Sequence, residues 1–456
     1  MRLQREAPGR RGLDQRRIHG LRAADLRVSR RRPDEPGAGR PRAARRRGGV
    51  GRLPARGLLA VHGHAPRQAT ARGALGLRRG GLATRPARRE SRHDSHGGLR
   101  GMPGMIARKP LYSVDALPVL QNRVYPTADE AAACPRGDLR LELDAECGVV
   151  RNAAFDASLV RYDRHYNNEQ SHSAAFERHL AEVGEIVRCH LGTRRLFEVG
   201  CGKAAFLERL AAGGCEIGGC DPTYEGDNPA VIREFFSPAL GVRRRQLVLR
   251  HVLEHVADPV AFLRLLGEAN AGGTIYIEVP CLDWILARRA WFDLFYEHVN
   301  YFRLDDFSRL FGRLSLACRV FGGQYLAVVA DLGSLREPAA IRELAAAEPE
   351  PSFPADLGPP PVESAAEEVI WGAASKGVIY ALLRQRGGGK VAAAVDVNPA
   401  KQGGFLPASG VPILAPEEFF RRFPRGTTVR VMNGNYLAEV RATLGDGYPC
   451  EAIDDH

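Results

Sequence analysis

Lysine is scarce in this sequence and is missing from its first hundred residues. Residues 1–100 contain 27 Arg, 7 acidic residues and no Lys, so their net charge is +20 (27 − 7). Because the whole chain carries +12, the remainder carries −8 (12 − 20). Basic arms that bind nucleic acids usually mix Lys with Arg, and here the part with hydrophobic periodicity is mildly acidic, so no nucleic-acid partner is indicated.

The Arg-rich head also lacks hydrophobic periodicity. It is rich in Arg, Gly, Ala and Pro and keeps neither the period of a strand nor that of a helix, so it cannot form an ordinary core. We expect residues 1–101 to be disordered, or to be translated from a start codon assigned too early, with Met102 or Met105 as the natural start.

Long apolar runs and an export signal are missing as well. No apolar run approaches the ~18 residues of a membrane span, and no segment has the pattern of a signal peptide. The nine Cys are scattered, and no C-x-x-C precedes Leu111, which is typical of free thiols in a reducing compartment. We therefore expect a cytoplasmic protein with no membrane partner.

From Leu111 onward the chain has the periodicity of a folded protein. Short alternating runs broken by Pro and Gly indicate a small β-rich module. Strands and helices then alternate, as in parallel α/β sheets, and this scheme starts again after the Pro-rich stretch "EPEPSFPADLGPPPVES". The predicted domains are an N-terminal module, an α/β domain, a linker and a C-terminal Rossmann-like domain, at 102–170, 171–345, 346–364 and 365–456.

The stretch "EVGCGKAAF" predicts a ligand-binding turn between a strand and a helix. Gly200 and Gly202 allow close approach of a ligand, and Asp221 follows at the distance of a residue that binds ribose hydroxyls. With Ala205 the turn also fits the G-x-G-x-x-A fingerprint for NAD. Glu198 favours S-adenosylmethionine, because an acidic strand end suits a cationic ligand better than a pyrophosphate.

The stretch "RHVLEHVADP" contains H-x-x-E-H, in which His251, Glu254 and His255 match the zinc motif of some metalloproteases. Here it follows an apolar strand of a nucleotide-type sheet, which argues against proteolysis. We interpret it as a loop lining the cofactor, with Asp258 and Pro259 opening the next helix.

The stretch "FYEHVNYF" places Glu297 and His298 among aromatic residues after another strand. Either this is a hydrogen-bonded core pair, or it is an acid/base pair at the edge of the sheet where ligands bind, and its position favours function. Upstream, "YDRHYNNEQSHSAAFERHL" is polar with interspersed aromatics and could simply cap a helix; its candidate residues are Tyr162, Tyr166, Gln170, Ser173 and His179.

Together these motifs resemble the three-domain sugar C-methyltransferases of deoxysugar biosynthesis, which are class I S-adenosylmethionine-dependent methyltransferases. The resemblance runs from about residue 111 to the C-terminus. It rests on "LPVLQNRVYP" and "ECGVV", on the two loop motifs above, on "YEHVNYF", and on "WGAASKG" with "DVNPAKQGGFLPASGVPI". It implies a Rossmann-like class I methyltransferase core between a small β-rich module and a C-terminal Rossmann-like α/β domain.

The resemblance also implies roles for individual residues. It makes His298 the base that activates the sugar, with Glu297 orienting it and Tyr296 beside them. It implies cofactor contacts from Glu198, Gly200, Cys201, Gly202, Asp221, Pro222, Arg250 and His251. It implies substrate contacts from Tyr166, Gln170, Ser173, Tyr301, Lys376, Asn398 and Lys401.

Some positions depart from the family pattern. The family's N-terminal module binds zinc through two Cys pairs, whereas Asp144 replaces the partner of Cys147 here, and Cys134 is the other remnant. A structural zinc is therefore not expected. Gln170 replaces a Ser, and Phe295 replaces a Tyr found in several members.

The sequence therefore predicts C-methylation of an activated, nucleotide-linked sugar by an S-adenosylmethionine-dependent enzyme. O- or N-methylation is the alternative within the same fold, since the same residues would deprotonate a hydroxyl. A nicotinamide-dependent oxidoreductase and a non-catalytic binding protein are alternatives from other classes.

Overall fold

The computed structural model describes residues 109–162, 165–167, 173–362 and 367–454. The chain divides into the units Met1–Gly98 and Leu99–His456, and the description below concerns the second. The predictions for residues 1–101 and for Gln170 fall outside the described residues.

The predicted β-rich module is a four-stranded antiparallel sheet with the order β1-β2-β3-β9. Its fourth strand comes from much later in the chain, from the stretch "FYEHVNYF". Val150 pairs with Tyr301 and Arg151 with Asn300. The elements are β1 (Tyr112–Pro118), α1 (Ala128–Ala132), β2 (Arg136–Leu143), β3 (Val150–Asn152) and β9 (Asn300–Tyr301).

The central domain is a seven-stranded sheet with the order β10-β11-β8-β7-β4-β5-β6. β4 to β8 pair in parallel, and β11 is antiparallel to both of its neighbours. The strands are β4 (Leu196–Val199), β5 (Ile217–Cys220), β6 (Val231–Ile232), β7 (Gln246–Arg250), β8 (Thr274–Pro280), β10 (Leu314–Val320) and β11 (Tyr325–Asp331).

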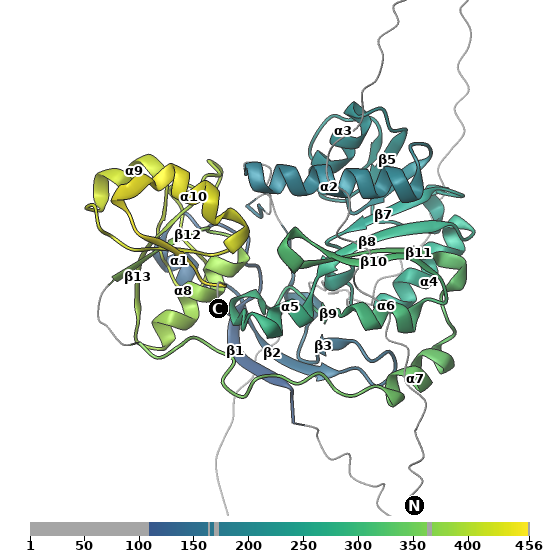
Figure 1. The fold of residues 1–456 in the computed structure, drawn as a ribbon, viewed down its shortest axis with the longest axis horizontal. Helices are drawn as coiled ribbons and strands as arrows, with labels where there is room; N and C mark the ends of the chain where they lie inside the picture. Colours follow the sequence, from purple (N-terminus) through teal and green to yellow (C-terminus); the bar gives the residue numbers. More distant parts are fainter. Residues whose placement is uncertain (1–108, 163–164, 168–172, 363–366, 455–456) are drawn as a thin grey trace, which may run out of the picture. The chain divides into compact units, whose positions relative to one another are not determined.

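Helices cover both faces of this sheet (Figure 1). Alternate residues of β7 point to opposite faces, so Val248 packs with α2 and α3, whereas Leu247 and Leu249 pack with α4. Such apolar runs are typical of parallel strands buried on both sides. The helices of this region are α2 (Ala174–Leu191), α3 (Ala205–Ala212), α4 (Pro259–Asn270), α5 (Leu282–Ala287), α6 (Leu304–Leu310) and α7 (Pro338–Ala347).

The C-terminal region is a second α/β unit, as the repeated sequence pattern predicts. Its five strands are all parallel, in the order β14-β13-β12-β15-β16. The strands are β12 (Glu367–Trp371), β13 (Lys390–Val395), β14 (Ile413–Leu414), β15 (Val429–Val431) and β16 (Cys450–Ala452), and the helices are α8 (Ser375–Arg386), α9 (Pro416–Arg422) and α10 (Leu437–Leu444). The predicted fold class is confirmed.

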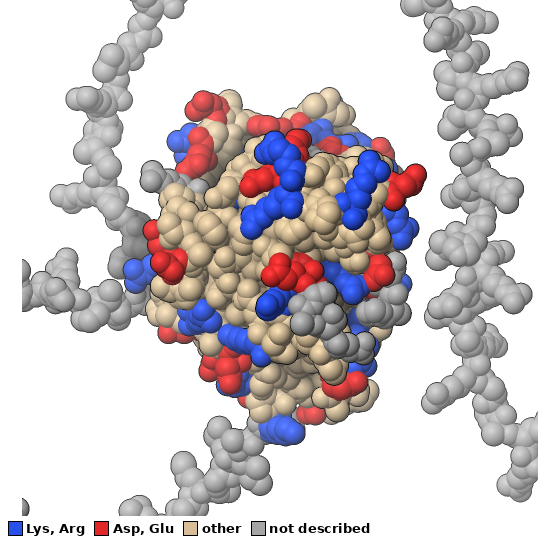
Figure 2. Space-filling model, turned by 90° about the vertical axis from the view of Figure 1, so that its left-hand side faces the viewer, with Lys and Arg blue, Asp and Glu red and all other residues tan. Residues whose placement is uncertain are grey.

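The described surface carries charges of both signs. On the face shown in Figure 2, Lys and Arg are interspersed with Asp and Glu, which differs from the single-sign stripe of a nucleic-acid-binding face. No helix among the described residues is long and apolar enough to cross a bilayer.

Candidate active site

The carboxyl ends of β4, β5 and β7 meet where the order of the sheet reverses. The chain leaves β4 for β5 on one side, whereas β7 pairs on the other side of β4. Open α/β sheets bind their ligands at such a switch point. The glycine turn, Asp221 and His251 follow these three strands, and the Gly202 N–H donates to Asp221 Oδ2 at 2.8 Å.

The glycine turn is shaped for a ligand. Gly200 has a φ of +72°, and a Cβ there would lie 2.5 Å from Val252 Cγ2, so only glycine fits. Gly202 also has a positive φ, of +54°, but a Cβ there would meet nothing within 4 Å. The space in front of Gly202 is therefore open, as a close-approaching cofactor requires.

Asp221 is held in a fixed orientation at the end of β5. Its Oδ1 accepts hydrogen bonds from the backbone N–H and the hydroxyl of Thr223, at 2.8 and 2.7 Å. Each carboxylate oxygen can accept more than one hydrogen bond, so the side chain can still accept from ribose hydroxyls. Next to it Pro222 is exposed, whereas Cys201 is buried.

Glu198 is buried on β4 and has an unsatisfied oxygen. Its side chain is 3% exposed, and within the described part of the chain Oε2 has no hydrogen-bond partner. Burial raises its pKa to about 8, with partial compensation from Arg250. A buried orphan oxygen is a place where a ligand's donor would be accommodated.

Beneath these loops lies a buried charge cluster centred on Glu278. This residue of β8 is fully buried and accepts hydrogen bonds from four side chains. They are His179 Nε2 at 2.9 Å, His251 Nε2 at 3.0 Å, the Arg250 guanidinium at 3.2 Å and the Tyr276 hydroxyl at 2.7 Å. Burial alone would raise the pKa of Glu278, but Arg250 and the two histidines outweigh it and hold the pKa well below its usual value.

Arg250 and His251 use their donors within this cluster. Arg250 bonds Glu278 and lies over the ring of Phe206, 4.4 Å from its centroid. His251 also contacts Glu254 Oε1, at 3.3 Å from Nδ1. Burial opposes protonation of His251, but its two carboxylate partners raise its pKa to about 9. Both residues therefore hold the carboxyl end of β7 against Glu278 of β8.

The H-x-x-E-H motif does not form a protease-type zinc site. Residues Leu253–His255 make a single 3₁₀ turn, and residues four apart do not share a face of such a turn. His251 turns to Glu278, whereas His255 Nδ1 lies 2.9 Å from the carbonyl oxygen of Glu297.

The stretch "FYEHVNYF" lies between the seven-stranded sheet of the central domain and the N-terminal sheet. The Val299 N–H donates to the carbonyl oxygen of Glu254 at 2.8 Å, and the Val299 carbonyl accepts from the Asn152 N–H at 2.8 Å. Val252, two residues before Glu254, lies where a Cβ atom at Gly200 would be 2.5 Å from its Cγ2. The stretch "FYEHVNYF" therefore lies next to the loops of the predicted cofactor site.

Glu297 and His298 are both buried, at 2% and 7% exposure. Glu297 accepts from the Tyr166 hydroxyl at 2.7 Å and from the Gln121 N–H at 3.4 Å. No hydrogen bond joins Glu297 to His298 in the described residues, so the predicted direct orientation of His298 by Glu297 is not seen. Burial raises the pKa of Glu297.

The imidazole of His298 is enclosed by rings. It packs on Phe295, with centroids 4.0 Å apart, and edge to face with His255 at 4.9 Å. Its Nδ1 has no partner in the described part of the chain. Burial, followed by the nearby His255 and His251, holds the pKa of His298 well below its usual value, so the ring is neutral.

Other predicted site residues make contacts within the protein. The Tyr296 hydroxyl accepts from the Asp156 N–H at 2.7 Å, and the Tyr301 hydroxyl donates to the Phe295 carbonyl at 2.8 Å. Ser173 caps α2 and donates to Glu439 Oε2 at 2.8 Å. These hydroxyls therefore hold the segments that surround the site.

The predicted substrate residues of the C-terminal domain are buried. Lys376 Nζ lies 3.3 Å from Asp293 Oδ2 and 4.7 Å from the centroid of the Trp284 ring. Asn398 Nδ2 donates to Asn167 Oδ1 at 3.2 Å. Lys401 is 2% exposed, and burial lowers its pKa.

The remnants of the zinc site do not form a metal centre among the described residues. Asp144 Oδ1 accepts the N–H groups of Glu146 and Cys147 at 2.9 and 3.0 Å, and its Oδ2 pairs with Arg151 at 3.1 Å. The Asp144 carboxylate therefore joins the backbone of the loop at Glu146 and Cys147 to the Arg151 side chain. Neither Cys134 nor Cys147 belongs to a cluster of potential ligands in this region.

Glu278, the centre of the buried cluster, was not predicted from the sequence. The available signal was a single charge inside the apolar strand "TIYIEVP", because an acidic side chain there must find buried partners. His255 was predicted only as part of a cofactor loop, although the fold brings its ring against that of His298.

Comparison with known families identifies two domains. The family described as a methyltransferase domain matches residues 164–318, and the C-methyltransferase C-terminal domain matches residues 363–446. These two matches identify the chain as a methyltransferase. It carries a C-methyltransferase C-terminal domain, as the sugar C-methyltransferases that it resembles do. The oxidoreductase alternative receives no support from either match.

Several solved structures are similar to roughly a third to two fifths of this chain. The PH0226 protein from Pyrococcus horikoshii OT3 is 12% identical over 38% of this chain and 99% of its own, with a TM-score of 0.31. A SAM-dependent methyltransferase from Archaeoglobus fulgidus is 17% identical over 33% and 94%, with a TM-score of 0.26. The Burkholderia thailandensis 1,6-didemethyltoxoflavin-N1-methyltransferase is 14% identical over 42% and 97%, with a TM-score of 0.27. No curated protein sequence matches.

The residues at the switch point fit S-adenosylmethionine. The open space at Gly202, the fixed carboxylate of Asp221 and the orphan oxygen of Glu198 are the features that would hold it. When bound there, it supplies a methyl group on a sulfonium centre.

Proposed function

We propose that this chain methylates a carbon atom of a nucleotide-linked sugar, with His298 as the general base. The observation that carries the proposal is the buried, neutral imidazole of His298 with an unpartnered ring nitrogen. It lies on a segment bonded to the loop after β7. The C-methyltransferase C-terminal domain favours carbon as the acceptor atom.

Carbon becomes nucleophilic when a proton next to a carbonyl group is removed. A neutral imidazole held beside the acceptor can take that proton. The C–H electrons then form the new bond to the methyl carbon, while the bond from the methyl carbon to sulfur breaks in line with it. The proton stays on His298 until it passes to solvent or to a product group.

Glu297, the residue before this base in the chain, forms a polar pair with Tyr166. Because the Tyr166 hydroxyl donates to Glu297, the pair is fixed, and it offers the sugar a hydrogen-bonding wall in an otherwise aromatic surrounding. We expect Lys376, Asn398 and Lys401 to interact with the anionic carrier of the sugar. Lys376 would exchange its ion pair with Asp293 for one with a phosphate oxygen.

The test of His298 separates chemistry from binding. His298→Ala is expected to lower kcat by about 10²- to 10⁴-fold, the usual contribution of a general base. Its affinity for S-adenosylmethionine, measured by calorimetry, should remain unchanged. His190→Ala, at the exposed end of α2, is the matched control and should keep full activity. Full turnover by His298→Ala would disprove the role of this residue.

The acceptor atom is tested separately. A panel of nucleotide-sugars is incubated with the enzyme and S-adenosylmethionine, and tandem mass spectrometry locates the added methyl group. A methyl group on carbon supports the proposal. A methyl group on oxygen or nitrogen would leave the enzyme class intact and contradict C-methylation.

A further inference from the structure

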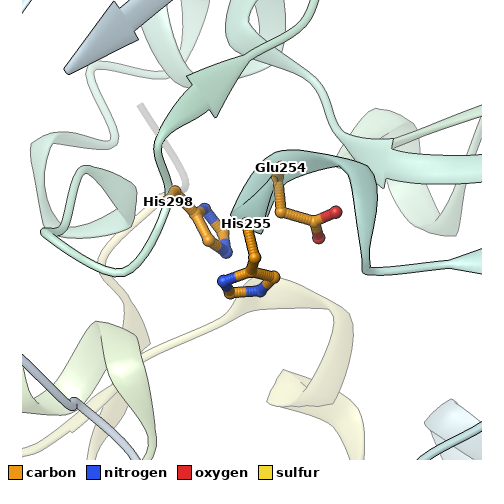
Figure 3. A group of neighbouring side chains, drawn as sticks. All are labelled: Glu254, His255 and His298. Carbon is orange, nitrogen blue, oxygen red and sulfur yellow. The ribbon is translucent and has the colours of Figure 1, made fainter. Parts of the chain in front are cut away.

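Three side chains that could bind a metal ion together lie at the edge of the site. Glu254, His255 and His298 each offer one ligand atom, and these atoms lie within 4.8 Å of one another. Figure 3 shows the imidazole rings of His255 and His298 close together, edge to face, with the Glu254 side chain on the same turn as His255. Glu254 and His255 belong to the 3₁₀ turn after β7, whereas His298 comes from the segment before β9.

His255 is already oriented as a metal ligand would be. Its Nδ1 lies 2.9 Å from the Glu297 carbonyl oxygen, which is only an acceptor, so Nδ1 carries the proton. Nε2 then has a free lone pair. Histidines that bind metals almost always donate their other N–H to a carbonyl or a carboxylate in this manner.

Glu254 and His298 supply unsatisfied atoms in a buried place. Glu254 is 1% exposed, and its Oε2 has no hydrogen-bond partner, while Oε1 contacts His251. His298 is 7% exposed and has an unpartnered Nδ1. Buried polar atoms without partners cost free energy, and a cation held between these groups would remove part of that cost.

We propose that Glu254, His255 and His298 bind a divalent transition-metal ion of the Zn²⁺ or Co²⁺ type. Two imidazole nitrogens and one carboxylate oxygen suit such ions, whereas Mg²⁺ and Ca²⁺ prefer oxygen ligands alone. With metal–ligand bonds of about 2.0–2.1 Å, neighbouring ligand atoms in a tetrahedral site lie ~3.3 Å apart. Binding therefore draws the three side chains closer together and leaves a fourth position for an outside ligand.

The consequence for catalysis rests on the proposed function. A bound ion uses a lone pair of His298, so metal binding and proton acceptance by this ring exclude each other. Metal at this site then inhibits methylation, and a chelator restores it.

The test measures binding of the metal ion by itself to the full-length protein. Chelator-treated protein is titrated with Co²⁺, followed by visible absorption, and with Zn²⁺, followed by calorimetry, without S-adenosylmethionine or acceptor. We expect one tightly bound ion per chain. His255→Ala and Glu254→Gln should each weaken metal binding by at least ~10-fold. Loss of a residue that is only hydrogen-bonded to a metal ligand already lowers metal affinity by about that factor.

The control addresses surface binding. Cys189 and His190 are both exposed at the end of α2 and form an obvious competing pair for a soft metal ion. His190→Ala should leave the strong binding unchanged. Unfolding midpoints of all variants establish that they are folded.

The proposal is overturned if no ion binds strongly, or if Glu254→Gln and His255→Ala bind it as the unchanged protein does. Loss of binding in His190→Ala alone would also overturn it. These readouts do not depend on turnover, so an active His298→Ala variant would disprove the base and leave the metal result intact.

Discussion

At the scale of single residues, Glu278 is the carboxylate at the centre of the buried charge cluster and accepts hydrogen bonds from four side chains. It is a fully buried carboxylate that compensates Arg250 and two histidines beneath the cofactor loops. Removing one member of a buried ion pair leaves the others uncompensated, which costs more than the pair itself contributes. The shape of the carboxyl edge of the sheet therefore depends on this one charge.

Glu278→Gln is expected to lower the free energy of unfolding by about 3–5 kcal/mol, because it leaves the Arg250 guanidinium buried without the carboxylate to which it is hydrogen-bonded. Urea denaturation measures this change. Glu185→Gln, which breaks the exposed pair with Arg188, is the control and should leave the midpoint unchanged. An equal effect of the two substitutions would show that the cluster adds no stability.

At the scale of elements, the turn between β4 and α3 determines how a ligand reaches the sheet. Its two glycines both have positive φ angles, but they differ in the space around them. Gly200 is packed against Val252, whereas Gly202 faces open space. One glycine is therefore needed for packing and the other for access.

Gly200→Ala and Gly202→Ala form a matched pair. Both impose a left-handed conformation on alanine, which costs about 1–2 kcal/mol, but only Gly200→Ala also forces a contact with Val252, which adds roughly 1–3 kcal/mol. Thermal unfolding should therefore show the larger loss of stability for Gly200→Ala. Equal losses would contradict the packing argument. Gly202→Ala should instead reduce affinity for S-adenosylmethionine, measured by calorimetry.

At the scale of the whole molecule, side chains of the C-terminal domain reach the other two domains. Arg386 donates to the carbonyl oxygens of Asp115 and Ala116, both at 2.7 Å, and Lys376 pairs with Asp293 at 3.3 Å. These contacts lie within the unit Leu99–His456, whereas Met1–Gly98 forms a separate unit. Among the described residues, these contacts join the C-terminal domain to the N-terminal module and to the central domain.

A chain that starts at Met102 should keep the unfolding midpoint and the cofactor affinity of the full chain, because it retains all of the described residues, which form the cores and the domain contacts reported above. Calorimetry and thermal unfolding of both forms check this. A lower midpoint for the shorter chain would show that the head contributes to the fold. N-terminal sequencing of the native protein tests independently whether residues 1–101 are made.

Much of the fold followed from local patterns. The glycine turns, the apolar strands and the helix that starts at Asp258 and Pro259 are encoded in contiguous residues, because backbone preferences and capping are local effects. The strand formed by Asn300 and Tyr301 was not predicted, since two residues carry no period and their pairing with Val150 and Arg151 is a long-range event. Glu278 was visible as a single charge in an apolar strand, but its partners His179 and His251 lie 99 and 27 residues away in the sequence.

The sequence by itself determined the class of enzyme and the α/β fold class, and it predicts the position of the cofactor turn. Only the tertiary structure decided which polar groups meet. His255 contacts Glu297, 42 residues away, and lies against His298, while Tyr296 and Tyr301 turn to the backbone. The physical reason is that burial and hydrogen-bond partners depend on chain segments far apart in sequence, and a buried polar group binds whatever partner the fold brings to it.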